Sequence, residues 1–167
     1  MPVAQTGQVQ DNRVLPLMRE AVLMVRMVLH RRLLSGLAGR RPGLSAPDAA
    51  QLCGAVINNL FGTRPEDAGI ARYARAHQEL VEEELRGLAR HVGELKPILT
   101  DALRMQVICD EQEGINSTGS LLMAKALGIL DTEQPLPLPS TFMQAVRKLA
   151  VAEGLVQVMP PLQAAAD

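Results

Sequence analysis

The chain has 167 residues with 17 basic and 18 acidic side chains, so its formal net charge is −1 and no overall field draws it to nucleic acid or to an anionic membrane. Apolar residues make up 47% of the sequence, but aromatic residues only 2%, and there is no tryptophan. This composition favours a helical core of Leu, Val, Ile, Ala and Met over a sheet. It also provides few aromatic side chains that could stack on nucleobases. The length fits one domain.

The first predicted helix, at about residues 14–37, is apolar on nearly every side. Arg19, Arg26 and His30 form one narrow stripe on it, because spacings of seven and four residues keep side chains on one line of a helix. Such a helix must be surrounded, either by the rest of a bundle or by a second subunit. We therefore expect a self-association surface made by the apolar residues between the charged ones: Met18, Val22, Val25, Val28 and Leu29.

The same helix is interrupted too often to span a membrane. A span needs about 20 mostly apolar residues, whereas Arg26 breaks the run and Arg31 and Arg32 end it. The first thirteen residues are polar and lack the basic leading region of a signal peptide. Cys53 and Cys109 are isolated inside helical patterns, which favours buried thiols in a reducing compartment. A cytoplasmic protein without a membrane span is expected.

Capping residues predict the second helix. Ser45 is followed three residues later by Asp48, with Pro47 in the first turn, which is the pattern of a helix start. The apolar pattern then continues to Phe61 and stops at Gly62. We expect one helix between these two boundaries.

A capping box, Thr63 with Glu66, predicts the start of a long third helix. Its charged face, including the run from Glu82 to Glu84, is expected to be solvated. Pro97 lacks an N–H and disfavours helical geometry in the residue before it, so the helix should kink or restart there and end at Gly114. The expected inward stripe recurs at spacings of four and three: Val81, Leu85, Leu88, Val92, Leu95 and Leu99.

Two further helices are predicted after this segment. One begins at a cap, Asn116 or Ser117, and runs through Leu130. A Pro-rich linker follows, and Ser140 should cap the last helix, which ends at Gly154.

Together these patterns predict an all-α fold: a single-domain bundle of five or six helices around the apolar first helix. The helical domain should span residues 13–156. Residues 1–12 are expected to be a flexible N-terminal segment, and residues 157–167 a loose C-terminal tail.

The sequence lacks the common motifs for metal binding, nucleophilic catalysis and phosphate binding. No Glu-x-x-His pair suits a carboxylate-bridged metal site, no Gly-x-Ser-x-Gly elbow exposes a nucleophile, and no glycine-rich phosphate loop is present. We therefore predict no catalytic, metal-binding or cofactor-binding residues. Scattered residues can still assemble an active site, but the missing motifs favour a protein that is not an enzyme.

Residues 120–158 resemble the latter half of a winged-helix DNA-binding module. The segment LLMAKALGI resembles its support helix, and STFMQAVRKLAVAEGLVQV resembles its recognition helix leading into a wing strand. The resemblance implies that Arg147 and Lys148 contact DNA phosphates. The competing interpretation, favoured because the helix has only these two basic residues, is a packing helix with its apolar residues inward: Phe142, Val146 and Leu149.

The main functional hypothesis is a non-catalytic helical interaction protein, such as an adaptor, a chaperone-like partner or an assembly factor, that forms a homodimer. Its partner is another protein or a second copy, with no cofactor and no nucleic acid. One alternative is a DNA-associated transcriptional regulator that uses residues 120–158. The second alternative is a small-ligand binder or enzyme with a pocket between helices, which an apolar pocket with convergent polar groups would favour.

Overall fold

The computed structural model describes residues 2–62, 68–91, 93–116, 118–130 and 135–155. Within these ranges the predicted all-α class is confirmed, with seven α-helices instead of five or six, one short 3-10 helix and no strand. The elements are α1 (Pro2–Arg40), α2 (Ala46–Phe61), α3 (Ala68–Ala76), α4 (Gln78–His91), the 3-10 helix η2 (Gly93–Leu95), α5 (Lys96–Gln112), α6 (Thr118–Ala126) and α7 (Pro139–Ala152).

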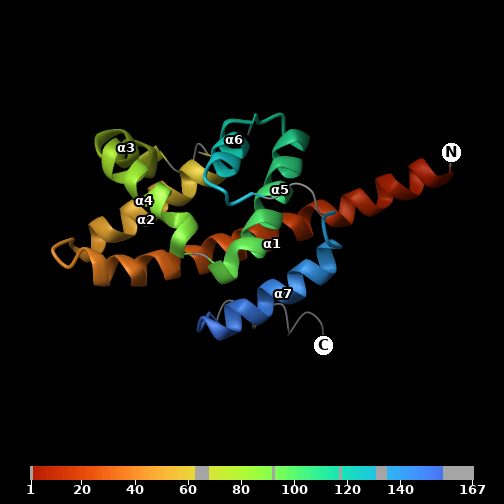
Figure 1. The fold of residues 1–167 in the computed structure, drawn as a ribbon. Helices are drawn as coiled ribbons and strands as arrows, with labels where there is room; N and C mark the ends of the chain where they lie inside the picture. Colours follow the sequence, from red (N-terminus) through yellow and green to blue (C-terminus); the bar gives the residue numbers. More distant parts are fainter. Residues whose placement is uncertain (1, 63–67, 92, 117, 131–134, 156–167) are drawn as a thin grey trace.

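Helix α1 is the centre of the arrangement. Helix α7 lies along one side of it, and α2 and α5 pack on the other side (Figure 1). Helix α2 in turn carries α3, α4 and α6. The molecule is thus organised around two neighbouring helices, α1 and α2, and the remaining helices cover them.

The apolar residues of α1 from which we expected self-association lie in the core of a single chain. All five are at most 8% exposed: Met18, Val22, Val25, Val28 and Leu29. The need for a second subunit was inferred from the apolar sides of this helix, and the chain's own helices already cover those sides.

Helix α2 begins and ends where the capping pattern predicts. The Ser45 hydroxyl accepts a hydrogen bond from the Asp48 N–H at 3.2 Å, and a proline occupies the first turn. Gly62 ends the helix with φ = 95°, a conformation that other residues rarely adopt.

Helix α7 ends as predicted but begins one residue before the predicted cap. Gly154 has φ = 80°, and the N–H of Leu155 bonds to the Ala150 carbonyl at 2.8 Å, which closes the last turn. The N-cap is Leu138, without a side-chain hydrogen bond, and not Ser140. Proline at position 139 explains the difference, because its fixed φ and missing N–H suit the first turn of a helix.

Other helix boundaries differ more. Helix α1 begins at Pro2 and not near residue 14, with a proline again in the first position. Helix α6 ends at Ala126, four residues before Leu130, and Gly128 follows with φ = 72°. The predicted start at Thr63 lies outside the described residues.

The predicted long third helix is divided into α3, α4 and α5. One break falls at His77, whose ring stacks on Tyr73 with centroids 4.3 Å apart and whose Nδ1 lies 3.3 Å from the Tyr73 carbonyl oxygen. The other falls at η2, after which α5 begins with Pro97 in its first turn. The chain thus restarts just before this proline.

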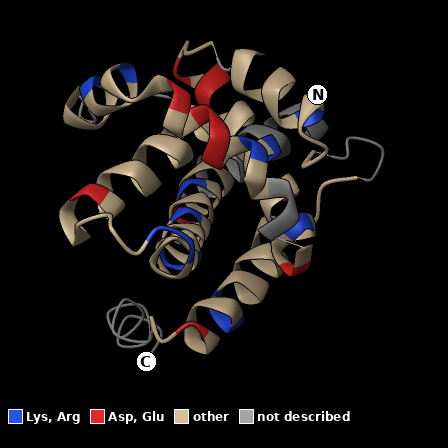
Figure 2. Ribbon diagram, turned by 60° about the vertical axis from the view of Figure 1, so that its left-hand side comes forward, with Lys and Arg blue, Asp and Glu red and all other residues tan. Residues whose placement is uncertain are grey.

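The inward stripe is confirmed for every member whose side chain is described, each at most 5% exposed: Val81, Leu85, Leu88, Leu95 and Leu99. The prediction of a solvated charged face is wrong for Glu84, one of the glutamates that form a continuous acidic run on α4 (Figure 2). Its side chain is 6% exposed, accepting hydrogen bonds from Arg40 Nη1 at 2.7 Å and Arg41 Nε at 3.0 Å. Arg40, the last residue of α1, and Arg41, which follows it, therefore hold a buried carboxylate of α4.

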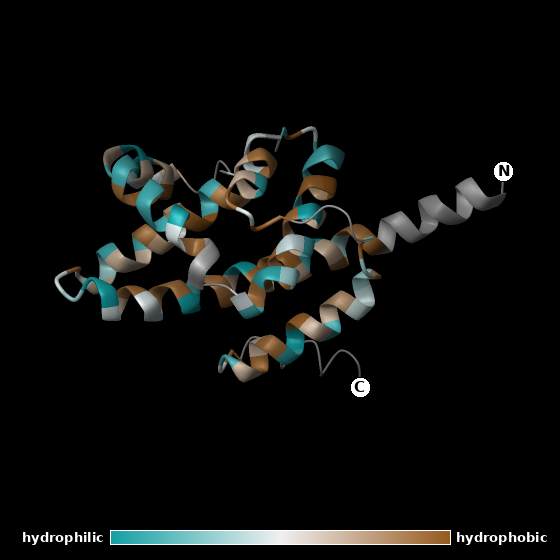
Figure 3. Ribbon diagram, in the orientation of Figure 1, coloured by the Kyte–Doolittle hydropathy of each residue, from teal (hydrophilic) through white to brown (hydrophobic). Residues whose placement is uncertain are grey.

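Hydrophilic residues alternate with hydrophobic ones along α1 and α7 (Figure 3). Within the described part of the chain, no helix has the length and apolar character needed to cross a membrane.

Candidate functional site

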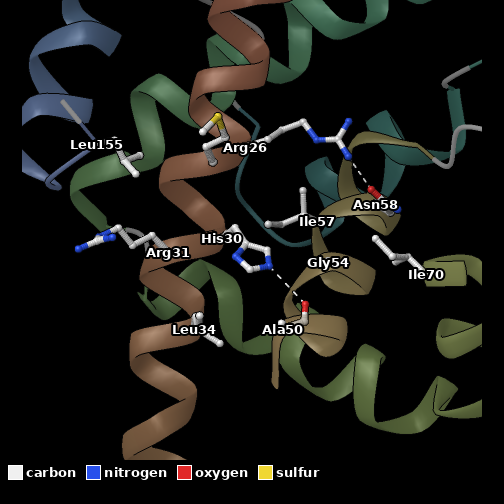
Figure 4. Close-up of a pocket in the computed structure, with 11 residues that line it drawn as sticks. Arg26, His30, Arg31, Leu34, Ala50, Gly54, Ile57, Asn58, Ile70 and Leu155 are labelled. Carbon is white, nitrogen blue, oxygen red and sulfur yellow. Dashed lines mark hydrogen bonds between the residues drawn. The ribbon is translucent and has the colours of Figure 1, made fainter. Parts of the chain in front are cut away.

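An open groove of about 450 Å³ runs along α1, bordered by α2 and α3 on one side and by the end of α7 on the other (Figure 4). Small-molecule sites have volumes of about 300 to 1,000 Å³, so this groove is large enough for a compact ligand. Its apolar lining consists of Met27, Leu34, Ala50, Gly54, Ile57, Ile70 and Leu155, and its polar lining of Arg26, His30, Arg31 and Asn58.

Small residues on α2 leave the space that the groove occupies. Ala50 and Gly54 are one turn apart and lie opposite His30 and Leu34 of α1 (Figure 4). Gly54 also allows α3 to approach, because a Cβ atom at this position would lie 3.1 Å from the Cδ1 of Ile70. Larger residues at either position would fill the hollow between the helices.

Asn58 carries the most distinctive polar group of the groove. The residue is 4% exposed, and its Oδ1 accepts a hydrogen bond from Arg26 Nη2 at 2.5 Å. This bond fixes the amide orientation, because the reversed amide would place two donors against each other. The Nδ2 atom is buried and has no hydrogen-bond partner among the described residues. Such an unpaired buried donor costs about 1 to 3 kcal/mol.

His30 lies next to this polar end on the same face of α1. Its Nε2 is 3.3 Å from the Ala50 carbonyl oxygen, which can only accept, so Nε2 carries the proton of this contact. Of the predicted polar stripe, His30 and Arg26 line the groove, whereas Arg19 pairs with Glu113 at 2.7 Å.

The charged side chains of the groove are both arginines. Its described lining contains Arg26 and Arg31 but no carboxylate, hydroxyl or thiol. Arg31 is exposed and makes no ion pair with a described residue, and its guanidinium lies beside the end of α7, where a Cβ on Gly154 would be 3.4 Å from Nη2. The site thus combines an apolar surface with cationic and hydrogen-bond-donating groups.

The residues of the winged-helix resemblance lie elsewhere. On α7, Arg147 is half-buried, with an Nε atom that lacks a hydrogen-bond partner, and Lys148 is exposed. Phe142 and Val146 are directed inward, at most 3% exposed, as the packing-helix interpretation predicts. Helix α7 packs along α1, whereas α6 packs on α2 and α5. The wing segment after residue 155 lies outside the described residues.

The cysteines are buried, as predicted, and neither forms a disulfide. Burial, with a smaller contribution from the charge of Glu84, raises the pKa of Cys53 to about 12, so its thiol stays protonated at neutral pH. In the described part of the chain, no group of three or more His, Cys, Asp or Glu residues is placed to hold a metal ion.

Sequence reasoning assigned no residue to ligand binding and missed the groove. Two patterns pointed toward it: the polar pair of Arg26 and His30 on an otherwise apolar helix, and the small residues Ala50 and Gly54 one turn apart. Neither pattern alone distinguishes a groove from close helix packing, because both depend on how α1 and α2 approach each other. No known protein family, curated protein or solved structure matches this chain.

Proposed function

We propose that the protein is a non-catalytic small-ligand-binding protein whose site is the groove along α1. The observation that carries this proposal is the groove itself, about 450 Å³ in volume, whose largely apolar lining also includes the polar side chains of Arg26, His30 and Arg31. The apolar body of a ligand would cover the side chains of Met27, Leu34 and Ile57, and a few polar groups beside an apolar surface are typical of small-molecule sites.

The composition of the lining supports binding instead of catalysis. A nucleophilic mechanism needs a nucleophile, a base within hydrogen-bond reach and a group that orients the base. No hydroxyl, thiol or carboxylate belongs to the described lining, so the groove has no nucleophile to pair with His30. The groups present can hold and orient a molecule.

The proposal is tested with anilinonaphthalene sulfonate, a fluorescent probe with apolar rings and an acceptor group. We expect saturable one-to-one binding to the folded protein, monitored by fluorescence titration. Ala50→Trp fills the groove and should weaken binding at least about tenfold, a change of about 1.4 kcal/mol. Ala145→Trp, at an exposed position on α7 outside the lining, is the matched control and should leave binding unchanged.

Circular dichroism of each variant must remain that of a folded helical protein, because partly folded states also bind this probe. Equal binding by both tryptophan variants, or binding that does not saturate, would contradict the proposal.

A second candidate function, interaction with another protein or a second copy, is favoured by apolar side chains exposed on and before α6. Ile115, Leu122 and Met123 are 39%, 61% and 37% exposed. Leu122 and Met123 are neighbours on α6, and contiguous exposed apolar side chains are typical of interaction surfaces. Light scattering should then report a dimer that Leu122→Lys converts to a monomer. A wild-type protein that stays monomeric at high micromolar concentration would contradict self-association through this surface.

A further inference from the structure

We propose that the ligand of the groove is an amphiphile with one anionic group, whose apolar body lies between α1 and α2 and whose anionic group lies at the border beside Arg31. This inference rests on the proposed function and adds the charge and the orientation of the ligand. It follows from which polar groups of the lining already have partners within the protein and which one has none.

The polar groups between α1 and α2 are already engaged or covered. Arg26 donates to Asn58 Oδ1 at 2.5 Å, makes a further interaction, and lies 5.6 Å from the centroid of the Phe61 ring. Asn58 Nδ2 is buried, so a ligand in the open groove does not reach it. His30 Nε2 contacts the Ala50 carbonyl oxygen. A charged group placed here would lose its water without gaining a partner, so this part of the groove suits the apolar body.

Arg31 differs from the other arginines of α1 whose side chains are described. Each of the others has a partner: Arg19 with Glu113, Arg26 with Asn58, Arg32 with Glu153, and Arg40 with Glu84. Arg31 is exposed, lines the groove, and makes no ion pair or hydrogen bond with a described residue. It is therefore the lining cation that can bind an anionic group without giving up a contact within the described part of the chain.

The negative groups at this border of the groove already have partners of their own. Glu153, near the end of α7, is 18% exposed and pairs with Arg32 at 3.1 Å. The last carbonyl groups of α7 accept backbone hydrogen bonds from the N–H groups of Glu153, Gly154 and Leu155. No carboxylate belongs to the described lining. An anionic ligand is therefore attracted to Arg31, and a cationic one is repelled.

The position of Arg31 sets the orientation of the ligand. Arg31 and Leu155 lie on one side of α1, and Ile70 lies on the other (Figure 4). Met27 and Leu34 line the groove about one turn before and one turn after Arg31. The guanidinium thus lies at the edge of an apolar surface. An amphiphile can cover this surface and keep its anionic group partly in water, which avoids the cost of burying a charge.

The test uses three probes with the same naphthyl body and different charges: naphthylacetate, naphthylacetamide and naphthylethylamine. Binding is measured by calorimetry on the full chain at neutral pH. We expect the acid to bind at least about threefold more tightly than the cationic amine, with the amide between them, and the affinity of the acid to fall as salt is added. Equal affinities of the acid and the amine would overturn the anionic assignment but leave the groove as a ligand site. Failure of all three probes and of the fluorescent sulfonate would overturn the proposed function as well.

Arg31→Gln locates the anionic group, with Arg86→Gln as the matched control, because Arg86 is exposed on α4 and outside the lining. Arg31→Gln should weaken the acid about two- to fivefold, leave the amide unchanged and strengthen the amine, whereas Arg31→Lys should keep the order of the wild type. The control should change none of the three. Both positions are exposed, and circular dichroism should confirm that each variant is folded. Equal effects of Arg31→Gln and Arg86→Gln, or a change of the same sign for acid and amine, would overturn the placement at Arg31.

Ala50→Trp locates the apolar body. Because the new ring fills the space between α1 and α2, it should weaken all three probes to a similar extent. An acid that binds this variant as tightly as the wild type would overturn the placement of the body.

Discussion

The buried carboxylate of Glu84 predicts that removing its charge costs less stability than removing its two arginine partners. Its side chain is 6% exposed, whereas those of its partners Arg40 and Arg41 are 35% and 30% exposed. Replacing Glu84 with Gln leaves two arginines that reach water, so the free energy of unfolding should fall by about 1 to 2 kcal/mol. Replacing both arginines with Met leaves a buried charge without its partners, which should cost about 3 to 5 kcal/mol.

Urea denaturation followed by circular dichroism measures both costs. In the background without the two arginines, Glu84→Gln should restore part of the lost stability, because it removes the unpaired charge. The reasoning is refuted if the double arginine variant is no less stable than Glu84→Gln, or if Glu84→Gln destabilises that background further.

The pH dependence of the free energy of unfolding tests the same interaction of Glu84 independently. Burial raises the pKa of Glu84, but the hydrogen bonds and charges of Arg40 and Arg41 lower it by more, so the pKa lies below the ordinary value of 4.5. A carboxyl with a lowered pKa in the folded state stabilises the fold above its unfolded pKa and loses this contribution as the pH falls through its folded pKa. The stability difference between wild type and Glu84→Gln should therefore be constant from about pH 5 to 7 and shrink in acid below about pH 4.

The remaining predictions concern α1 and α7. Val25→Asp places a carboxylate at a position 4% exposed and should unfold the protein in circular dichroism, whereas Leu23→Asp, 57% exposed on the same helix, should change stability by no more than about 0.5 kcal/mol. A folded Val25→Asp variant that only changes its mass in light scattering would instead support self-association through this face. Wild type should show no measurable binding to duplex DNA at physiological salt in a fluorescence anisotropy titration, and replacing Arg147 and Lys148 with Glu should change nothing. Salt-sensitive binding that the double variant abolishes would support the DNA-associated regulator.

Helix boundaries were predictable where a few neighbouring residues determine them. The start of α2 at Ser45 and its end at Gly62 depend on one side-chain hydrogen bond and one positive φ, both local in sequence. The break at His77 was not predicted, because no proline or glycine lies near it to mark a helix end, and the packing of α3 and α4 on α2 determines the separation.

Side-chain environments were less predictable than boundaries. Glu84 shares the inward face of α4 with Val81, Leu85 and Leu88, and this spacing could have indicated its burial. The sequence does not show that arginines more than forty residues away supply its partners. The same holds for the groove, because its lining residues come from α1, α2 and α3, and the sequence does not show how these helices lie side by side.

The position of α7 along α1 has a consequence for biosynthesis. Met24 of α1, 5% exposed, lies with Ala150 of α7 around one small gap, so side chains more than a hundred residues apart cover each other. At roughly 5 to 20 residues per second, a ribosome needs about 6 to 25 seconds to synthesise the chain between them. During this interval one side of α1 is without its native cover. Charged residues within or beside an apolar segment lower its tendency to aggregate, and Arg26, Arg31 and Arg32 interrupt the apolar run of α1 in this way.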